Sequence, residues 1–233
     1  VPVSPIPKGI ATPSLLSQII SAKYRYGLPL YRQETWFNEL GIELSRKTMS
    51  DWMMRCGDLF EDLYAVLKQH LLTQRVLNAD ETTLNVIKEE KSTCYMWVYC
   101  SGTDKPNNTN IPNIVLFDYQ NSRRSDCVVN YLSGYTGYLQ VDGYQAYAKT
   151  EAELAGCMAH ARRKFTDAKA AQPKKKTGKA DVVLSLIQKL YGIEVNIKGK
   201  TFDEIKASRQ KKAKPILDKI QSWALAHKEK IPE

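Results

Sequence analysis

Val76-Leu77-Asn78-Ala79-Asp80 begins a part of the chain in which runs typical of β-strands replace the helical patterns that precede it. Residues 95–100, Tyr-Met-Trp-Val-Tyr-Cys, and residues 114–118, Ile-Val-Leu-Phe-Asp, are aromatic or β-branched runs of the kind found in buried strands. Residues 137–143, Gly-Tyr-Leu-Gln-Val-Asp-Gly, form a fourth run with an aspartate and a glycine at its end. The middle of the chain is therefore predicted to form a β-sheet.

The segments between these runs predict how the strands are connected. The polar stretch 104–110 is expected to be a hairpin loop, and residues 126–132 a short helix that ends near Gly134. A helix over 144–154 and a short strand near 156–159 are expected to follow. Three strands in a meander, a helix, a strand, a helix and a strand are the order of a ribonuclease H-like fold. We therefore predict an α/β fold with a mixed sheet of this retroviral-integrase-like kind over residues 76–170.

Helical patterns flank the predicted sheet on both sides. Residues 1–13 are interpreted as a proline-stiffened linker and residues 14–75 as a helical region. Within that region Ser45 is expected to cap a helix whose apolar residues keep helical period as far as Leu67. Residues 171–233 are lysine-rich and are predicted to form a basic helical insertion.

The helical region also contains a candidate DNA-reading segment. A short helix, a glycine-containing turn and a second helix that begins at Ser45 resemble a helix-turn-helix. In that interpretation the residues that face DNA are Arg46, Lys47, Thr48 and Ser50. An ordinary helical hairpin with a capped second helix has the same pattern, so the pattern leaves both interpretations open.

The positive charge of the chain is concentrated in its last third. Residues 1–155 hold 15 basic and 17 acidic residues, a net of −2, whereas residues 156–233 hold 19 basic and 8 acidic residues, a net of +11. Such asymmetry favours a polyanionic partner, of which nucleic acid is the commonest. A solvated basic helical face is the alternative.

Composition excludes several other classes of protein. The five cysteines form no C-x-x-C pair, which suits a reducing cytosol better than a disulfide scaffold. The three histidines are far apart and have no cysteine at zinc-ligand spacing. No apolar run reaches the roughly 18 residues of a membrane helix, so no membrane partner is expected.

Two aspartates at the predicted strand ends are the candidate metal ligands. Asp80 follows Val76 and Leu77, and Asp142 closes the run 138–141. A carboxylate at the end of an apolar strand is costly to desolvate unless it meets a cation, and Mg²⁺ prefers carboxylate ligands. Two carboxylates from neighbouring strands could therefore hold divalent metal for phosphoryl transfer. The alternative is that each aspartate only caps a turn, which Asp142 followed by Gly143 would suit.

Three motifs extend this interpretation through a resemblance. Residues 78–82 (Asn-Ala-Asp-Glu-Thr), 139–144 (Leu-Gln-Val-Asp-Gly-Tyr) and 156–165 (Gly-Cys-Met-Ala-His-Ala-Arg-Arg-Lys-Phe) are similar to successive motifs of bacterial transposases of the insertion sequence sixty-six family. Residues 5–9 and 28–33, with the later segments 189–191 and 214–215, also resemble it. The resemblance covers the chain from end to end in the same motif order.

The resemblance implies a DDE-type enzyme. Asp80 and Asp142 would be its first two catalytic carboxylates, holding Mg²⁺ or Mn²⁺. The complete protein would hydrolyse double-stranded DNA at the ends of an insertion sequence, and the freed 3′-hydroxyl would attack target DNA. We would then expect a homo-oligomer in the active complex and a cytoplasmic location at the bacterial nucleoid.

One feature of the family is missing. Its third carboxylate is a glutamate in a downstream Asn-Asn-x-x-Glu-Arg segment, and no such segment is present here. We expect that the chain stops inside the helical insertion before that motif and that it is inactive alone. Glu194, Glu204 and Glu229 lack the context and are interpreted as solvated helix residues.

The third motif supplies candidate phosphate-binding residues. The predicted DNA-contacting residues there and in the following lysine run are His160, Arg162, Arg163, Lys164, Lys174, Lys175 and Lys176. His160 could instead approach the metal site or be a core histidine, and the cations could be the solvated start of a helix. Glu81 is expected to point to the opposite face of the strand from Asp80. Tyr144 and Tyr147 are expected to pack, although one of them could stack on a flipped base.

Two rival functions fit the same features. The missing glutamate favours a non-enzymatic DNA-binding module. A structure-specific nuclease of the same fold would differ from a transposase only in its substrate.

Overall fold

The computed structural model describes residues 4–7, 9–87, 89, 93–102, 112–171 and 178–227. These residues form two compact units: residues 1–75 with 98–118, and residues 76–97 with 119–233. The predicted hairpin loop 104–110 lies outside the described residues, as do Lys174, Lys175 and Lys176.

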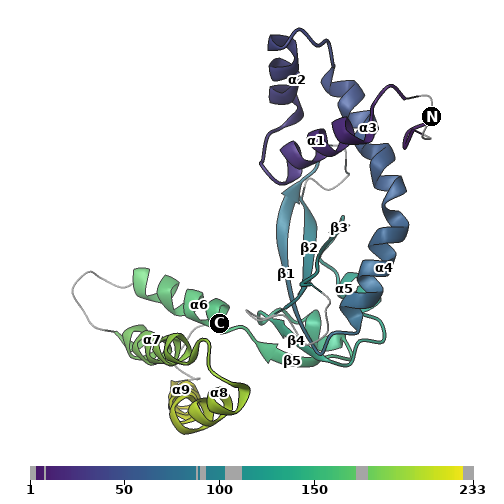
Figure 1. The fold of residues 1–233 in the computed structure, drawn as a ribbon. Helices are drawn as coiled ribbons and strands as arrows, with labels where there is room; N and C mark the ends of the chain where they lie inside the picture. Colours follow the sequence, from purple (N-terminus) through teal and green to yellow (C-terminus); the bar gives the residue numbers. More distant parts are fainter. Residues whose placement is uncertain are drawn as a thin grey trace. The chain divides into compact units, whose positions relative to one another are not determined.

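The first unit contains four helices among the residues described: α1 (Pro13–Tyr24), α2 (Leu30–Glu39), α3 (Arg46–Leu59) and α4 (Glu61–Leu72) (Figure 1). Leu16 and Ile19 of α1 are buried together with Phe37 of α2 and Met49 and Trp52 of α3. The expected helix from Ser45 to Leu67 is not continuous. It is interrupted at Phe60, whose φ and ψ of −93° and 0° are not those of an α-helix. This break ends α3 before α4 begins.

Ser45 caps α3 as expected. Its Oγ accepts a hydrogen bond from the backbone amide of Thr48 at 3.1 Å, which satisfies one of the amide groups left free at a helix start. We expect Ser45→Ala to lower the free energy of unfolding by about 1 kcal/mol in urea denaturation. Ser45→Asp, which retains an acceptor, is the control and should stay near wild type; equal losses in both variants would contradict the capping role.

The strands form one five-stranded mixed sheet in the order β3-β2-β1-β4-β5 (Figure 1). Their bounds are β1 (Val76–Asn85), β2 (Thr93–Ser101), β3 (Val115–Gln120), β4 (Tyr138–Val141) and β5 (Glu153–Gly156). All four strand runs recognised in the sequence are present. β1 is parallel to β4, and β4 is parallel to β5. The predicted short helix is α5 (Ser125–Tyr131), between β3 and β4.

The segment after β4 differs from the prediction. The helix expected over 144–154 is only a 3₁₀ turn, η1 (Tyr147–Lys149). The strand expected near 156–159 is β5, which ends at Gly156, and Met158 already begins a helix. At the end of this segment the physical reason is pairing: residues 153–156 register with β4, so they form sheet hydrogen bonds in place of helical ones.

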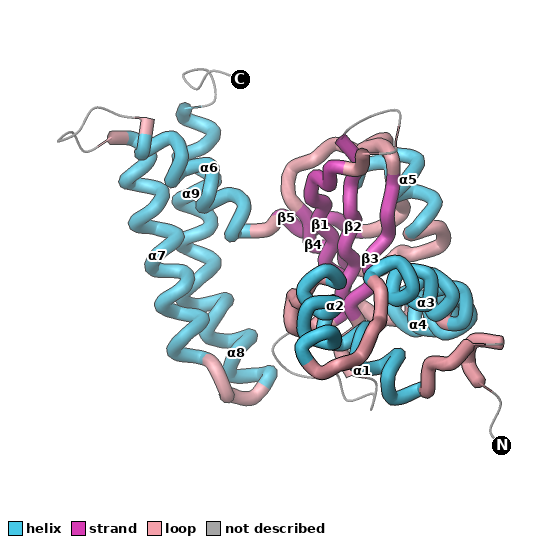
Figure 2. The backbone as a smooth tube through the Cα atoms, turned by 90° about the horizontal axis from the view of Figure 1, so that it is seen from above, coloured by secondary structure: helices cyan, strands magenta, loops and turns pink. Residues whose placement is uncertain are grey.

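The C-terminal helices pack on one another within the second unit. They are α6 (Met158–Ala170), α7 (Lys179–Ile197), α8 (Phe202–Ser208), the π-helical turn η2 (Arg209–Ala213) and α9 (Lys214–His227). Figure 2 shows α6, α7 and α9 side by side. Lys169 of α6 pairs with Asp181 of α7 at 2.7 Å, and the Phe165 ring lies 5.8 Å from Trp223. Among the helices described, none is both long and apolar enough to cross a membrane.

Candidate functional site

The parallel pair β1–β4 brings the two candidate aspartates to matched positions. Val76, Leu77 and Asn78 of β1 register with Tyr138, Leu139 and Gln140 of β4. Asp80 and Asp142 each lie two residues beyond the last pair of that register. In a regular continuation of the register their Cα atoms would be about 5 Å apart, because neighbouring strands have that spacing. The sheet therefore joins two positions that are 62 residues apart in the chain.

Asp80 is an exposed acid in the middle of a strand. Its side chain is 57% exposed, and β1 continues past it to Asn85. The sequence-based argument from a costly, desolvated strand-end carboxylate is therefore wrong for Asp80, because this carboxylate retains water. Its Oδ1 accepts a hydrogen bond from the amide of Glu81 at 3.0 Å. An accessible carboxylate of this kind can bind a cation without further opening of the structure.

Asp142 follows the end of β4 and is partly buried. Its Oδ1 accepts a hydrogen bond from the amide of Tyr144 at 2.8 Å, so the turn-capping interpretation of this residue is observed. Capping does not exclude a metal role, because a carboxylate offers about four acceptor positions. The Asp80 carboxylate on β1 and the Asp142 carboxylate just after β4 are hard oxygen donors, the type of ligand that Mg²⁺ and Mn²⁺ prefer.

His160, expected among the DNA-contacting residues, lies beside Asp80. It belongs to the first turn of α6, and its Nε2 is 3.5 Å from Asp80 Oδ2. Its Nδ1 is buried and has no hydrogen-bond partner among the residues described. The structure thus places this histidine beside the Asp80 carboxylate.

Asp80, Asp142 and His160 do not by themselves form a complete metal site in the described part of the chain. In the described part of the chain, no group of three or more His, Cys, Asp or Glu side chains is arranged to hold a metal ion. Glu194 and Glu204, two of the acids that the sequence offered, are engaged elsewhere. Glu194 pairs with Arg209, and Glu204 forms the capping box of α8 with Thr201. Glu229 lies outside the described residues.

A buried charge network next to the aspartates was not found from the sequence. The side chain of Glu81 is only 2% exposed and forms an ion pair with Arg123. Arg123 Nε donates to Glu81 Oε1 at 2.8 Å, and Tyr147 Oη donates to Glu81 Oε2 at 2.5 Å. Burial alone would lower the pKa of Arg123, but the hydrogen bond to Glu81 together with the charges of Glu81, Tyr144 and Asp142 raises it. Strand alternation indicated the direction of Glu81, and no local signal indicated Arg123.

The other candidate DNA-contacting residues are divided between the two units. Arg46 and Lys47 are exposed at the start of α3, whereas Thr48 and Ser50 are partly buried. Thr48 is engaged by Ser45, because their hydroxyl groups lie 2.9 Å apart. Arg162, Arg163 and Lys164 are all exposed on α6.

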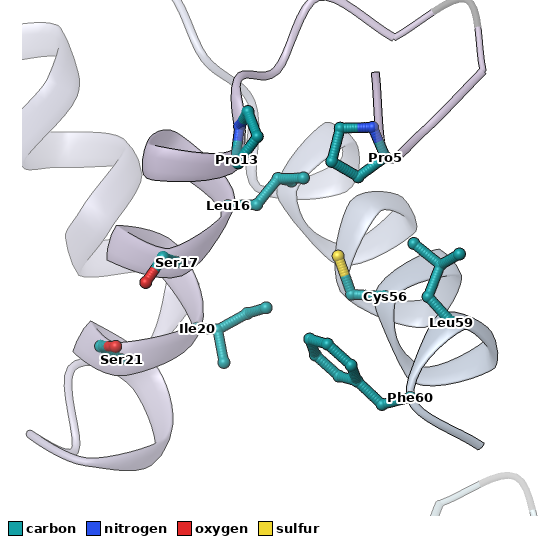
Figure 3. A pocket seen from close by; sticks show the side chains of 9 residues that line it. All are labelled: Pro5, Pro13, Leu16, Ser17, Ile20, Ser21, Cys56, Leu59 and Phe60. Carbon is teal, nitrogen blue, oxygen red and sulfur yellow. The ribbon is translucent and has the colours of Figure 1, made fainter. Parts of the chain in front are cut away.

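A pocket in the first unit is lined mainly by apolar side chains. It has a volume of about 290 Å³ and lies between α1 and α3, where Leu16, Ile20, Cys56 and Phe60 point into it (Figure 3). Burial raises the pKa of the Cys56 thiol, which keeps it protonated and a poor nucleophile. This pocket has no acidic group in its lining and belongs to the first unit, whereas Asp80 and Asp142 belong to the second.

Comparisons with known proteins identify the family. The profile of the Transposase IS66 family matches residues 8–233. Two uncharacterized proteins of Sinorhizobium fredii, y4qI and y4jD, are 33% and 31% identical over 93% and 96% of this chain. The matched regions cover 42% and 45% of those relatives, so the chain spans less than half of their length. No solved structure matches the chain. The chain therefore belongs to the IS66 family of transposases.

Proposed function

We propose that this chain carries the first two catalytic carboxylates, Asp80 and Asp142, of a DDE-type DNA transposase. The observation that carries the proposal is the parallel register of β1 and β4, whose continuation by two residues matches Asp80 on β1 with Asp142 just after β4. Membership of a transposase family supports the reaction class. The complete protein would cleave phosphodiester bonds at insertion-sequence ends and join the freed 3′-hydroxyl to target DNA.

The strand order supports a ribonuclease H-like fold. Three sequential neighbours, β1, β2 and β3, are followed by α5 and then by β4 and β5 on the other side of β1. The helix expected between β4 and β5 is replaced by the short turn η1, which is a departure from the expected order. The central position of β1 accounts for the placement of Asp80 beside β4.

Asp80 and Asp142 would hold Mg²⁺ or Mn²⁺. When bound, such ions activate the attacking oxygen and stabilise the leaving oxygen of a phosphodiester. Asp80 is available for this role because its carboxylate is solvated. Asp142 is held in one orientation by the amide of Tyr144, which reduces the conformational entropy that binding would otherwise remove.

The cations of α6 would position the DNA backbone. His160 in the first turn of α6 is near Asp80, and Arg162, Arg163 and Lys164 follow it on the same helix with exposed side chains. Side chains of this kind bind phosphate oxygens and set the register of a duplex. The exposed Arg46 and Lys47 are a second candidate contact in the first unit, as the helix-turn-helix hypothesis requires.

Calorimetric titration of the 233-residue chain with Mn²⁺ tests this function. We expect the wild type to bind the metal and Asp80→Ala and Asp142→Ala to lose most of that binding, because each removes one of two carboxylate ligands. We also expect the chain to leave DNA uncut, because the described residues supply no third acid at this position.

The matched control is Asp126→Ala, which removes an exposed carboxylate on α5 that pairs with Arg124. It should bind Mn²⁺ like the wild type. A wild-type chain that binds DNA but no Mn²⁺ would overturn the proposal and favour the non-enzymatic DNA-binding module.

A further inference from the structure

Arg123 contacts two residues that are neighbours of the candidate aspartates, Glu81 and Tyr144. Glu81 directly follows Asp80, and the amide of Tyr144 is hydrogen-bonded to Asp142. Arg123, between β3 and α5, contacts both Glu81 and Tyr144. These contacts connect the parts of β1 and of the β4 end that carry the two carboxylates.

Arg123 makes contacts through its backbone carbonyl, through the charge of its guanidinium group and through the planar face of that group. Its carbonyl accepts a hydrogen bond from Tyr144 Oη at 2.5 Å, and its guanidinium carbon lies 3.8 Å from the centre of the Tyr144 ring. The guanidinium pairs with Glu81. One arginine therefore fixes the tyrosine by a hydrogen bond and a cation–π contact, and the glutamate by charge.

Tyr147 completes the network from the 3₁₀ turn. Its hydroxyl donates to Glu81 Oε2 at 2.5 Å, and its ring packs edge-on against Trp97 of β2 at 5.9 Å. Tyr147 and Trp97 are fully buried. Both oxygens of the Glu81 carboxylate are thus engaged, one by Arg123 and the other by the buried Tyr147.

Burial restricts where the Glu81 carboxylate can lie. An ionised carboxylate that is almost fully removed from water has a large free-energy cost in any position where its partners are absent. Glu81 is therefore confined to the place where Arg123 and Tyr147 meet it. Because alternate side chains of a strand point to opposite faces, the network does not occupy the face that carries Asp80, where His160 is 3.5 Å from the carboxylate.

We infer that Arg123 is a positioning residue that, with Glu81, Tyr144 and Tyr147, holds the Asp80 and Asp142 carboxylates at a fixed spacing before a divalent cation binds. This inference rests on the proposed function for the identity of the ligand. Preorganised ligands bind more tightly because less ordering remains to be done on binding, and groups that orient metal ligands commonly change metal affinity by about 10–100-fold.

The test uses three conservative variants of the 233-residue chain. Tyr144→Phe removes the hydrogen bond to Arg123 and keeps the ring, and Tyr147→Phe removes the hydrogen bond to Glu81. Arg123→Lys keeps the charge but loses the planar guanidinium. The matched control is Arg124→Lys, one residue away, whose side chain is 77% exposed. Circular dichroism identifies variants that remain folded, and the two phenylalanine variants keep the test decisive if Arg123→Lys does not fold.

Two measurements are made on each folded variant. Mn²⁺ affinity by calorimetry should weaken about 10–100-fold in the three network variants and stay unchanged in Arg124→Lys. Without metal, hydrogen exchange at the Tyr144 amide should become about tenfold faster or more, because its bond to Asp142 is no longer held in place. Unchanged Mn²⁺ affinity in folded network variants would overturn the inference, whatever the exchange rate.

The exchange measurement separates this inference from the proposed function. A wild-type chain that binds no Mn²⁺ would overturn the metal-binding function. The exchange of the Tyr144 amide would then decide alone whether the network positions Asp142: faster exchange in the variants supports positioning, and unchanged exchange overturns it.

Discussion

Asparagine in place of Asp80 or Asp142 is expected to lower DNA strand transfer by the complete protein about a thousandfold or more. The substitution keeps the size of the side chain and its hydrogen-bond acceptor but removes the charge that would hold the metal. Metal ions contribute several kcal/mol of transition-state stabilisation, and about 4 kcal/mol corresponds to about a thousandfold in rate. The measurement is a strand-transfer assay with labelled insertion-sequence ends and Mg²⁺.

Asp126→Asn is the control for this prediction. Asp126 is an exposed acid in the first turn of α5, where it pairs with Arg124. Its replacement should leave strand transfer within about twofold of wild type, as expected for a surface ion pair. Strand transfer at wild-type rates by either Asp80→Asn or Asp142→Asn would exclude a DDE mechanism through these residues.

Arg123→Ala is expected to lower the free energy of unfolding by about 3 kcal/mol. The substitution leaves the Glu81 carboxylate buried without its cation, and breaking a buried ion pair from one side typically costs about 3–5 kcal/mol. The lower end of that range applies because the Arg123 side chain is 40% exposed, so water can enter and screen the charge. Urea denaturation followed by circular dichroism measures the effect.

Two controls accompany this prediction: Arg124→Ala tests the loss of one positive charge, and the double variant Glu81→Met with Arg123→Met tests the loss of the whole ion pair. Arg124→Ala removes the same charge from an exposed position and should change stability by about 0.5 kcal/mol or less. Glu81→Met combined with Arg123→Met removes both charges, so it should recover most of the stability that Arg123→Ala loses. An Arg123→Ala protein as stable as Arg124→Ala would show that the buried glutamate does not depend on this arginine.

Local features of the fold were predictable because they depend on near neighbours in the chain. The four strand-forming runs recognised in the sequence correspond to the strands that begin at residues 76, 93, 115 and 138. Ser45 could be recognised as a cap because helix capping is a local interaction. The hydrogen bond that its side chain accepts comes from Thr48, three residues away. Strand alternation predicted that Glu81 would point away from Asp80, and the buried ion pair of Glu81 agrees with a face that water does not reach.

Features that depend on distant parts of the chain were predicted less well. The apolar pattern after Ser45 predicted one helix, but the structure has two, α3 and α4, separated at Phe60. Residues 144–154 were predicted to form a helix, but they contain only the 3₁₀ turn η1 and the start of β5, which pairs with β4. Asp80 was expected to be desolvated, but its side chain is mostly exposed. In each case the outcome depended on packing or pairing that no local pattern specifies.

The sequence by itself determined the strand-forming runs, the helix cap, the basic C-terminal third and the two aspartates that define the candidate site. These follow from conformational preferences and charges that each short segment carries with it. Only the tertiary structure decided that β4 lies beside β1, that His160 contacts Asp80, and that Arg123 pairs with a glutamate 42 residues away. The physical reason is that strand order and the burial of charge are settled by the free energy of the whole sheet and of its covering side chains.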